Sequence, residues 1–401
     1  MQGQNVAPTA GGRTAEKDVA ATETPEAGGD SIRISLLTCS AGEEIYSLFG
    51  HTAIRCENLT RGIDLVFNYG VFDFGAPNFI LRFALGETDY RLGILPYKRF
   101  ARDYHYDGRD VWQQTLNLRQ EEKERLMELL DENYKPENRV YRYNFFYDNC
   151  ATRPRDMVEK AIDGTLQYAD DMEDTHTGIT FRDVLHRYSE GHAWSRFGMD
   201  LCMGSKADVP ISRRTLMFVP FYVQECFGRA EVVDKAGNAR PLVAAERKIV
   251  SAAQPTDPQR SDGISPMQCT LLLLVLVAGA TAYGIRRGKS LWGIDVVIFV
   301  AAGVAGCILA FLALFSQHPA VSPNYLLFVL HPLHLLCLPW MANRVRKGQK
   351  SWYMALNCVV LIFFILLWPV IPQKFDLTVL PLALCLLIRS VSNLVLTHKK
   401  K

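Results

Sequence analysis

The run Tyr-Asn-Phe-Phe-Tyr-Asp-Asn-Cys-Ala-Thr-Arg-Pro-Arg-Asp at residues 143–156 decides how the rest of the chain is interpreted. Its aromatic first half favours a strand that ends at Asp148-Asn149, two residue types that often cap helices. The apolar residues that follow share one face of a predicted helix, and they are Met157, Val158, Ala161 and Ile162. We therefore predict Cys150 at a helix N-terminus, where unpaired N–H groups and the helix dipole make a thiol ionise more easily.

A cysteine nucleophile needs a general base, and a histidine lies in a predicted hairpin upstream. Residues 47–56 and 63–70 are typical of strands, and the polar residues 57–62 between them are typical of a turn. His51 falls in the first of these strands. A lone cysteine is most often a small apolar core residue, and a lone histidine a hydrogen-bonded one. Their combination with a helix start favours a catalytic pair.

The register of this hairpin decides which residue orients His51. If Arg55 lies opposite Asp64, a favourable charge pair, then His51 lies opposite Asn68 and both project from the same sheet face. An amide beside an imidazole fixes its tautomer, as in Cys-His-Asn enzymes. Since a slip of one residue would turn Asn68 to the other face, Asp73 is the reserve candidate.

Three motifs together resemble a known family. They are Phe-Gly-His-Thr-Ala-Ile-Arg at residues 49–55, Asn-Tyr-Gly at 68–70 and Asp-Asn-Cys-Ala-Thr-Arg-Pro-Arg-Asp at 148–156. They resemble the N-terminal periplasmic domain of the Lnb lipoprotein N-acyltransferases of diderm bacteria, over roughly residues 31–230. That domain is similar to permuted papain-like enzymes, in which the histidine strand precedes the cysteine helix. The resemblance implies an α+β permuted papain-like thiol domain with a small antiparallel sheet.

The resemblance also implies a reaction and its partners. Cys150 would take a fatty acyl chain from a membrane phospholipid as a thioester, and the α-amino group of a diacylglyceryl-cysteine lipoprotein would accept it. His51 would be the base and Asn68 its orienter. Candidates for substrate binding or for an oxyanion contact are Tyr147, Asn149, Arg153 and Tyr69. Core packing is the alternative role for Tyr147, and an ordinary salt-bridge network is the alternative for Arg153. We expect no cofactor and no metal, since the histidines lack the spacing of zinc ligands.

The composition of the 401-residue chain differs between its first part, which resembles a soluble chain, and its apolar last part. The net charge of +2 argues against nucleic acid as the main partner. Residues 1–30 are polar and lack an apolar pattern, as in a disordered tail. We predict a periplasmic catalytic domain over residues 31–262, whose polar stretch 227–262 joins a transmembrane domain over 263–401. Because the tail carries no signal-peptide pattern, we expect that a natural signal sequence has been removed.

Five apolar stretches in the last part of the chain are each long enough to cross a bilayer. They lie near residues 267–285, 292–315, 324–342, 353–371 and 376–396. Lys and Arg cluster after the first, third and fifth stretches, which predicts a cytoplasmic C-terminus and a periplasmic first domain in a bacterial inner membrane. His331 and His334 share one face of the third stretch and are candidates for a role within the membrane, with hydrogen bonding between helices as the alternative.

Two other functions remain open on the sequence. The same cysteine and histidine would serve a membrane-anchored peptidase or amidase acting on cell-wall peptides. A non-enzymatic envelope assembly protein would use Cys150 only for packing. Five of the ten cysteines lie in the first domain, so that either Cys150 is free beside two disulfides or all five are reduced.

Overall fold

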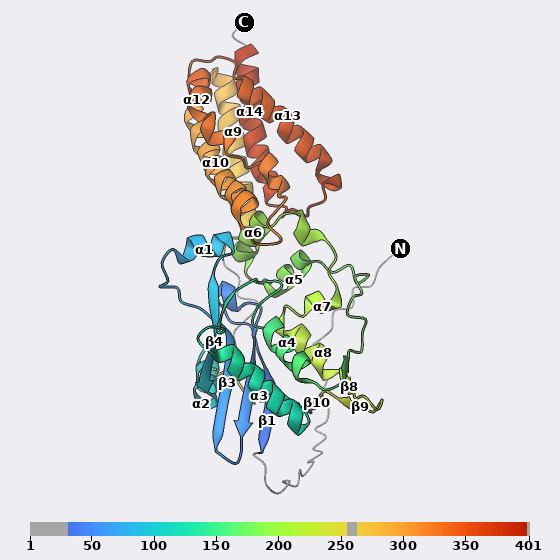
Figure 1. The fold of residues 1–401 in the computed structure, drawn as a ribbon. Coiled ribbons are helices and arrows are strands. Elements are labelled where there is room, and N and C mark those ends of the chain that lie inside the picture. The colour runs from blue at the N-terminus through green and yellow to red at the C-terminus, as the bar shows by residue number, and fades with distance from the viewer. Residues whose placement is uncertain (1–30, 255–262, 399–401) are drawn as a thin grey trace.

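The computed structural model describes residues 31–254 and 263–398 as an α+β domain and a helical bundle (Figure 1). The predicted tail at residues 1–30 and part of the predicted juncture at 227–262 lie outside the described residues.

A seven-stranded antiparallel sheet forms the core of the first domain, in the order β10-β5-β1-β2-β3-β4-β6. Its strands are β1 (Ile32–Cys39), β2 (His51–Asn58), β3 (Ile63–Val71), β4 (Asp89–Pro96), β5 (Val111–Leu116), β6 (Val140–Arg142) and β10 (Val243–Val250). The predicted α+β class is confirmed, but the prediction of a small sheet is wrong. β10 lies in the stretch predicted as a polar juncture. Its exposed charged residues are typical of an edge strand, and they gave the stretch a polar composition.

Helices cover both faces of this sheet. On one face lie α3 (Gln120–Tyr134) and α4 (Thr152–Ala161), which bury Leu126, Leu130 and Val158 against Ile34 of β1. On the other face α2 (Tyr97–Tyr106) buries Phe100 against Leu37 and Ala53. Each fully buried side chain of this size contributes about 1.5–3 kcal/mol. The two cores hold β1, β2 and β3 as a rigid platform.

The hairpin of β2 and β3 has a register two residues away from the predicted one. Arg55 pairs with Val66, and Glu57 pairs with Asp64. Two residues is one full side-chain period, so every residue keeps its predicted sheet face. The expected charge pair therefore still forms along the diagonal, with Arg55 Nη2 at 2.7 Å from Asp64 Oδ2.

The elements around residue 150 are only partly as predicted. β6 ends at Arg142, so the strand predicted to run up to Asp148-Asn149 is too long, and a bridge from Asn144 to Asp148 closes a turn there. The helix predicted after Cys150 is confirmed as α4, and α5 (Phe181–Tyr188) follows it. The other elements of this domain are α1 (Phe79–Leu85), α6 (Ala193–Cys202), α7 (Arg213–Leu216), α8 (Pro220–Gly228), β7 (Thr165–Gln167), β8 (Glu231–Val233) and β9 (Ala239–Pro241).

The bundle contains four described helices long and apolar enough to span a membrane, or five spans if one bent pair counts as one. The straight helices are α9 (Pro266–Arg287), α10 (Trp292–Phe315), α13 (Trp352–Leu367) and α14 (Val379–His398). The third predicted stretch is broken into η3 (Tyr325–Phe328), α11 (Leu333–Leu336) and α12 (Leu338–Arg346), with a bend of 76°. Pro332 and Pro339 interrupt it, because proline cannot donate the backbone hydrogen bond of a helix interior.

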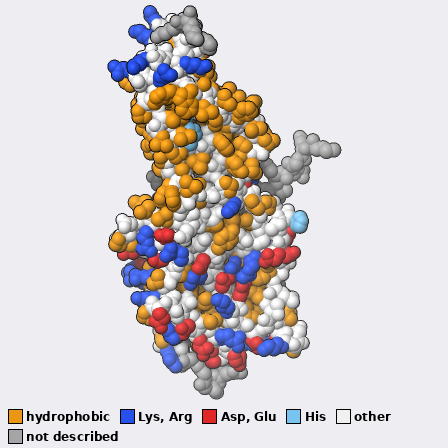
Figure 2. All heavy atoms as spheres, turned by 45° about the horizontal axis from the view of Figure 1, so that its top comes forward, with side chains coloured by type: hydrophobic (Ala, Val, Ile, Leu, Met, Phe, Trp, Pro, Cys, Tyr) orange, Lys and Arg blue, Asp and Glu red, His pale blue; other side chains and the backbone are white. Residues whose placement is uncertain are grey.

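Polar contacts join the first domain to one end of the bundle. Asn324 Nδ2 donates to the Leu201 carbonyl at 2.8 Å, and Gln373 Nε2 donates to the Met203 carbonyl at 3.0 Å. Lys374 forms an ion pair with Asp183 at 2.8 Å. Lys and Arg side chains gather at the opposite end of the bundle, beyond a broad apolar belt (Figure 2).

Candidate active site

Cys150 lies in the turn that starts α4, as predicted. Asn149 holds this turn together, since its Oδ1 accepts from the backbone N–H of Ala151 at 2.8 Å and of Thr152 at 3.0 Å. Its Nδ2 donates to the carbonyls of Phe145 and Phe218. Asn149 is therefore a buried helix cap. With its side chain committed to these contacts, it positions Cys150 and has no donor left for an oxyanion.

His51 and Asn68 contact each other, with His51 Nε2 at 2.6 Å from Asn68 Oδ1. His51 begins β2, and Asn68 lies in β3. They meet although the register differs from the predicted one, because both stayed on the same sheet face. Asp73, the reserve candidate, instead accepts from the N–H of Gly75 in the following loop.

Gly70 lies next to both His51 and Cys150. A β-carbon added at Gly70 would lie 3.5 Å from Cys150 Cβ and 4.0 Å from His51 Cε1. Both atoms thus lie within van der Waals distance of one point, which the glycine leaves open. Gly70 has a φ of +92°, a conformation that side chains with a β-carbon rarely adopt. The structure therefore brings Cys150, His51 and Asn68 together at one end of β2 and β3.

Burial, rather than the helix start, dominates the acidity of the thiol. It raises the pKa of Cys150 to about 11, although the backbone N–H groups of Thr52 and Cys150 and the charge of Arg109 favour the thiolate. The prediction that the thiol ionises more easily is therefore wrong for the resting site, since burial outweighs these groups.

The imidazole is neutral for the same reason. Burial lowers the pKa of His51 to about 4, helped by the charge of Arg109 and opposed by the hydrogen bond to Asn68. At neutral pH the resting pair is thus a thiol beside an uncharged imidazole, and the arrangement suits general-base activation more than a stored ion pair.

A second thiol lies near the first. Cys39 pairs with His51 across β1 and β2. Burial raises the pKa of Cys39 to about 12, above the value of about 11 for Cys150. Cys39 lies in a fully buried strand position, whereas Cys150 is partly exposed. Cys150 is consequently the more accessible of the two.

Arg109 belongs to the site although no sequence motif marks it. It lies between α2 and β5, and its Nε donates to the Ser40 carbonyl at 2.8 Å. Its Nη2 is buried without a hydrogen-bond partner. Because its charge affects the pKa of both Cys150 and His51, the guanidinium lies in the electrostatic field of the site.

Two of the other predicted substrate contacts have structural partners. Arg153 forms a two-point ion pair with Asp148, at 2.6 and 2.8 Å, and lies 3.5 Å from the centre of the Tyr141 ring. Tyr69 is fully buried, and its hydroxyl donates to Asn133 at 3.1 Å. Arg153 thus takes part in the salt-bridge network named as its alternative, and Tyr69 packs in the core.

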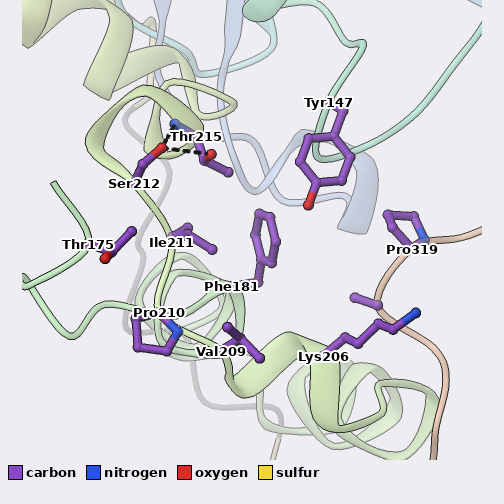
Figure 3. A pocket seen from close by; sticks show the side chains of 11 residues that line it. Tyr147, Thr175, Phe181, Lys206, Val209, Pro210, Ile211, Ser212, Thr215 and Pro319 are labelled. Carbon is purple, nitrogen blue, oxygen red and sulfur yellow. Dashed lines mark hydrogen bonds between the residues drawn. The ribbon is translucent and has the colours of Figure 1, made fainter. Parts of the chain in front are cut away.

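Tyr147 lines a pocket of about 590 Å³ (Figure 3). Its ring meets Phe181 edge to face at 5.9 Å. Cys150, His51 and Asn68 are absent from the residues that line this pocket. The lining is mainly apolar, with Lys206 as its charged member. Tyr147 therefore belongs to this pocket and is half exposed, and the structure gives it no contact with the thiol.

The two membrane histidines stack on each other, with ring centroids 3.9 Å apart. His334 is fully buried, and its ring nitrogens contact the Val329 carbonyl at 2.9 Å and the Tyr353 hydroxyl at 2.6 Å. The Nδ1 of His331 is buried without a hydrogen-bond partner. These contacts match the alternative of hydrogen bonding between helices.

Two further predictions concern cysteines and metals. None of the ten cysteines forms a disulfide. Among residues 31–254 and 263–398, no group of three His, Cys, Asp or Glu side chains is arranged to hold a metal ion.

Comparison with known families gives two matches along the chain. Residues 21–187 match the Lnb N-terminal periplasmic domain, and residues 258–401 match the Lnb transmembrane domain. No curated protein and no solved structure matches the chain. The two family matches follow each other in the order seen in the structure. The chain therefore consists of an Lnb periplasmic domain joined to an Lnb transmembrane domain, and it belongs to the Lnb family of membrane proteins, the lipoprotein N-acyltransferase family.

Proposed function

We propose that this protein moves a fatty acyl chain from a membrane phospholipid, through a thioester on Cys150, to the α-amino group of a diacylglyceryl-cysteine lipoprotein. The observation that carries the proposal is that Cys150 Cβ and His51 Cε1 both lie within 4.0 Å of one point beside Gly70, with Asn68 hydrogen-bonded to the imidazole. Family membership supports acyl transfer, and this cluster supplies a nucleophile, a base and an orienter for it. The order of the histidine strand and the cysteine helix supports a permuted papain-like arrangement.

In the first step His51 acts as general base. Asn68 Oδ1 accepts from Nε2, so the neutral ring carries its proton there and offers Nδ1 as acceptor. The thiol proton moves to Nδ1 while the Cys150 sulfur bonds to the ester carbonyl carbon. The ester C–O bond then breaks, and the lysophospholipid leaves as an alcohol with the proton returned by His51.

In the second step the lipoprotein amine attacks the thioester. A C–N bond forms, the C–S bond breaks, and His51 transfers the amine proton to the departing sulfur. The product is an amide, and the free thiol is restored. The low pKa of His51, about 4, keeps the ring neutral and able to accept a proton at the start of each step.

Backbone N–H groups and one guanidinium supply the stabilisation of negative charge; of these, only the helix-start N–H was predicted from the sequence. The N–H groups of Thr52 and Cys150 are directed at the sulfur, and the unpaired Nη2 of Arg109 adds positive charge nearby. A preorganised donor of this kind is worth about 3 kcal/mol in a transition state. We assign these three groups to the sulfur anion and the tetrahedral oxyanion, in place of Asn149 and Tyr147.

The orientation follows from the charges. Basic residues gather at the end of the bundle remote from the α+β domain (Figure 2), which supports a cytoplasmic C-terminus and a catalytic domain at the periplasmic face of the inner membrane. There the enzyme would reach both the phospholipid donor and the lipoprotein acceptor.

The test uses the full chain in phospholipid vesicles with a synthetic diacylated lipopeptide, and mass spectrometry of its N-terminus. Wild type should add one acyl chain, and Cys150→Ala should lose at least about a thousandfold in rate, as nucleophile removal does in other acyl-transfer enzymes. Cys226→Ala, a cysteine outside the site, is the matched control and should keep wild-type activity. Equal transfer by wild type and Cys150→Ala would refute the proposal, and cleavage of cell-wall peptides instead would favour the peptidase alternative.

A further inference from the structure

Helix α1 and the loop before it expose an unusual amount of apolar surface. α1 has no buried residue, and Ile80 is 83% exposed. Phe74 in the preceding loop is 63% exposed, and Leu81 and Phe83 are about half exposed. The one charged residue of α1, Arg82, forms a half-exposed ion pair with Asp89. We call Phe74, Ile80, Leu81 and Phe83 the α1 patch. Contiguous exposed apolar surface of this kind marks an interaction site.

The position of the α1 patch is set by the membrane bundle. The N–H of Gln317, two residues beyond the end of α10, donates to the Leu85 carbonyl at 2.8 Å. The ring of His318 donates to the Phe83 carbonyl at 2.8 Å. Figure 1 shows α1 beside the end of the bundle that faces the α+β domain. The α1 patch therefore lies at the level where α10 leaves the hydrocarbon.

A run of aromatic rings connects the α1 patch to the active site. Phe83 stacks with Phe79 at 6.3 Å, and Phe79 stacks with Phe72 at 5.9 Å. Phe72 stacks with Tyr90 at 5.0 Å. Tyr90 Cδ2 lies 4.0 Å from the point beside Gly70 at which Cys150 and His51 meet. A continuous run of contacting aromatic rings thus extends from the α1 patch to the residues beside Cys150 and His51.

We propose that the α1 patch lies in the hydrocarbon of the periplasmic leaflet, and that the donor acyl chain follows these aromatic rings to Cys150. The occupant of the patch is lipid, because α1 is tied to the end of a membrane span, its most exposed side chains are apolar, and the charge of Arg82 is paired with Asp89. This inference rests on the proposed function for the role of the ring path, while the membrane contact of α1 stands on the geometry alone.

The first experiment measures the membrane contact. The full chain is placed in vesicles of phosphatidylethanolamine and phosphatidylglycerol that contain a phospholipid with a diazirine in its acyl chain. After irradiation, mass spectrometry should find lipid adducts on residues 72–85, and none at Leu59, an exposed residue in the turn at the other end of β2 and β3. Absence of lipid adducts on α1 would overturn the inference.

The second experiment measures the path. Ile80→Asp should lower acyl transfer from vesicle phospholipid at least tenfold, yet leave the acylation of Cys150 by water-soluble p-nitrophenyl acetate within about twofold of wild type. The rate of phospholipid transfer by Ile80→Ser should lie between the rates of wild type and Ile80→Asp. Leu59→Asp is the control, and it should change neither the phospholipid rate nor the p-nitrophenyl acetate rate. Unchanged phospholipid transfer by Ile80→Asp would overturn the path. If wild type transfers no chain while α1 is labelled, the proposed function fails and the membrane contact stands.

Discussion

Two buried histidine sites lie in this chain, and they differ in what surrounds the ring. His334 in α11 has both ring nitrogens engaged, by the Val329 carbonyl and the Tyr353 hydroxyl. His51 is hydrogen-bonded to Asn68 through Nε2 and lies beside a glycine and a thiol. The sequence offers both as candidates, His51 as the base of a catalytic pair and His334 for a role within the membrane or in hydrogen bonding between helices. Under the proposed function, His51 is set apart by a ring nitrogen left for a reacting group, whereas a hydrogen-bonded ring alone is common to both sites.

Exchange of each histidine for glutamine should separate the two sites most strongly. His51→Gln removes the base and should lower acyl transfer about a hundred- to ten-thousandfold, the usual contribution of general-base catalysis. His334→Gln breaks a buried polar network and should lower thermal stability, with activity per folded molecule within about twofold of wild type. The measurements are acyl transfer to a diacylated lipopeptide and thermal unfolding in detergent. Equal losses of activity in both variants would contradict the distinction.

Asn68 tests how much the orienting amide adds. Asn68→Ala removes one hydrogen bond to a neutral ring, worth about 1–1.5 kcal/mol, so transfer should fall about tenfold. The loss should appear in kcat more than in KM, because Asn68 acts on His51 and does not touch the substrate. Asn58→Ala, at the far end of β2, is the matched control. A variant that keeps full activity would show that the packing around Gly70 holds His51 without help.

The sequence predicts this site because its parts depend on local rules. The helix start after Cys150 follows from capping residues, and the shared face of His51 and Asn68 follows from strand alternation. That second prediction survived a register error because the error was two residues, one full period. A one-residue error would have placed Asn68 on the wrong face.

Other features depend on tertiary contacts and escaped prediction. Arg109 lies in a connection that carries no motif, and it joins the site because the fold brings Ser40 and α2 to it. The acidity of Cys150 was predicted with the wrong sign, since burial is a property of the assembled domain. β10 was missed because an exposed edge strand lacks the apolar alternation of a half-buried one. In the membrane part, the length of each apolar stretch identifies the spans. It does not show that the third stretch is bent at its prolines.

The pH dependence of activity distinguishes a resting site with a neutral His51 and thiol from one with an imidazolium–thiolate ion pair. Catalysis needs unprotonated His51, so activity should be lost as pH falls through its pKa of about 4 and should be flat between about pH 5.5 and 8. An ordinary histidine would give an acid limb near pH 6.5. The measurement is kcat/KM for hydrolysis of a short, soluble ester, so that no lipid phosphate titrates in the same range. An acid limb at pH 6.5 would contradict the buried, neutral imidazole.

Arg109 permits the most specific test, because its effect on two pKa values is measured apart from its effect on the rate. Its charge lowers the pKa of both His51 and Cys150, so Arg109→Gln should raise both. The acid limb should move up from pH 4 toward 6.5, and alkylation of the Cys150 thiol by iodoacetamide at pH 9 should slow a few-fold, because less thiolate is present. Arg109→Lys keeps the charge and should shift neither. A fold defect would not move an imidazole and a thiol in the same direction, so a joint shift, absent in the lysine variant, identifies the field of this guanidinium as the cause.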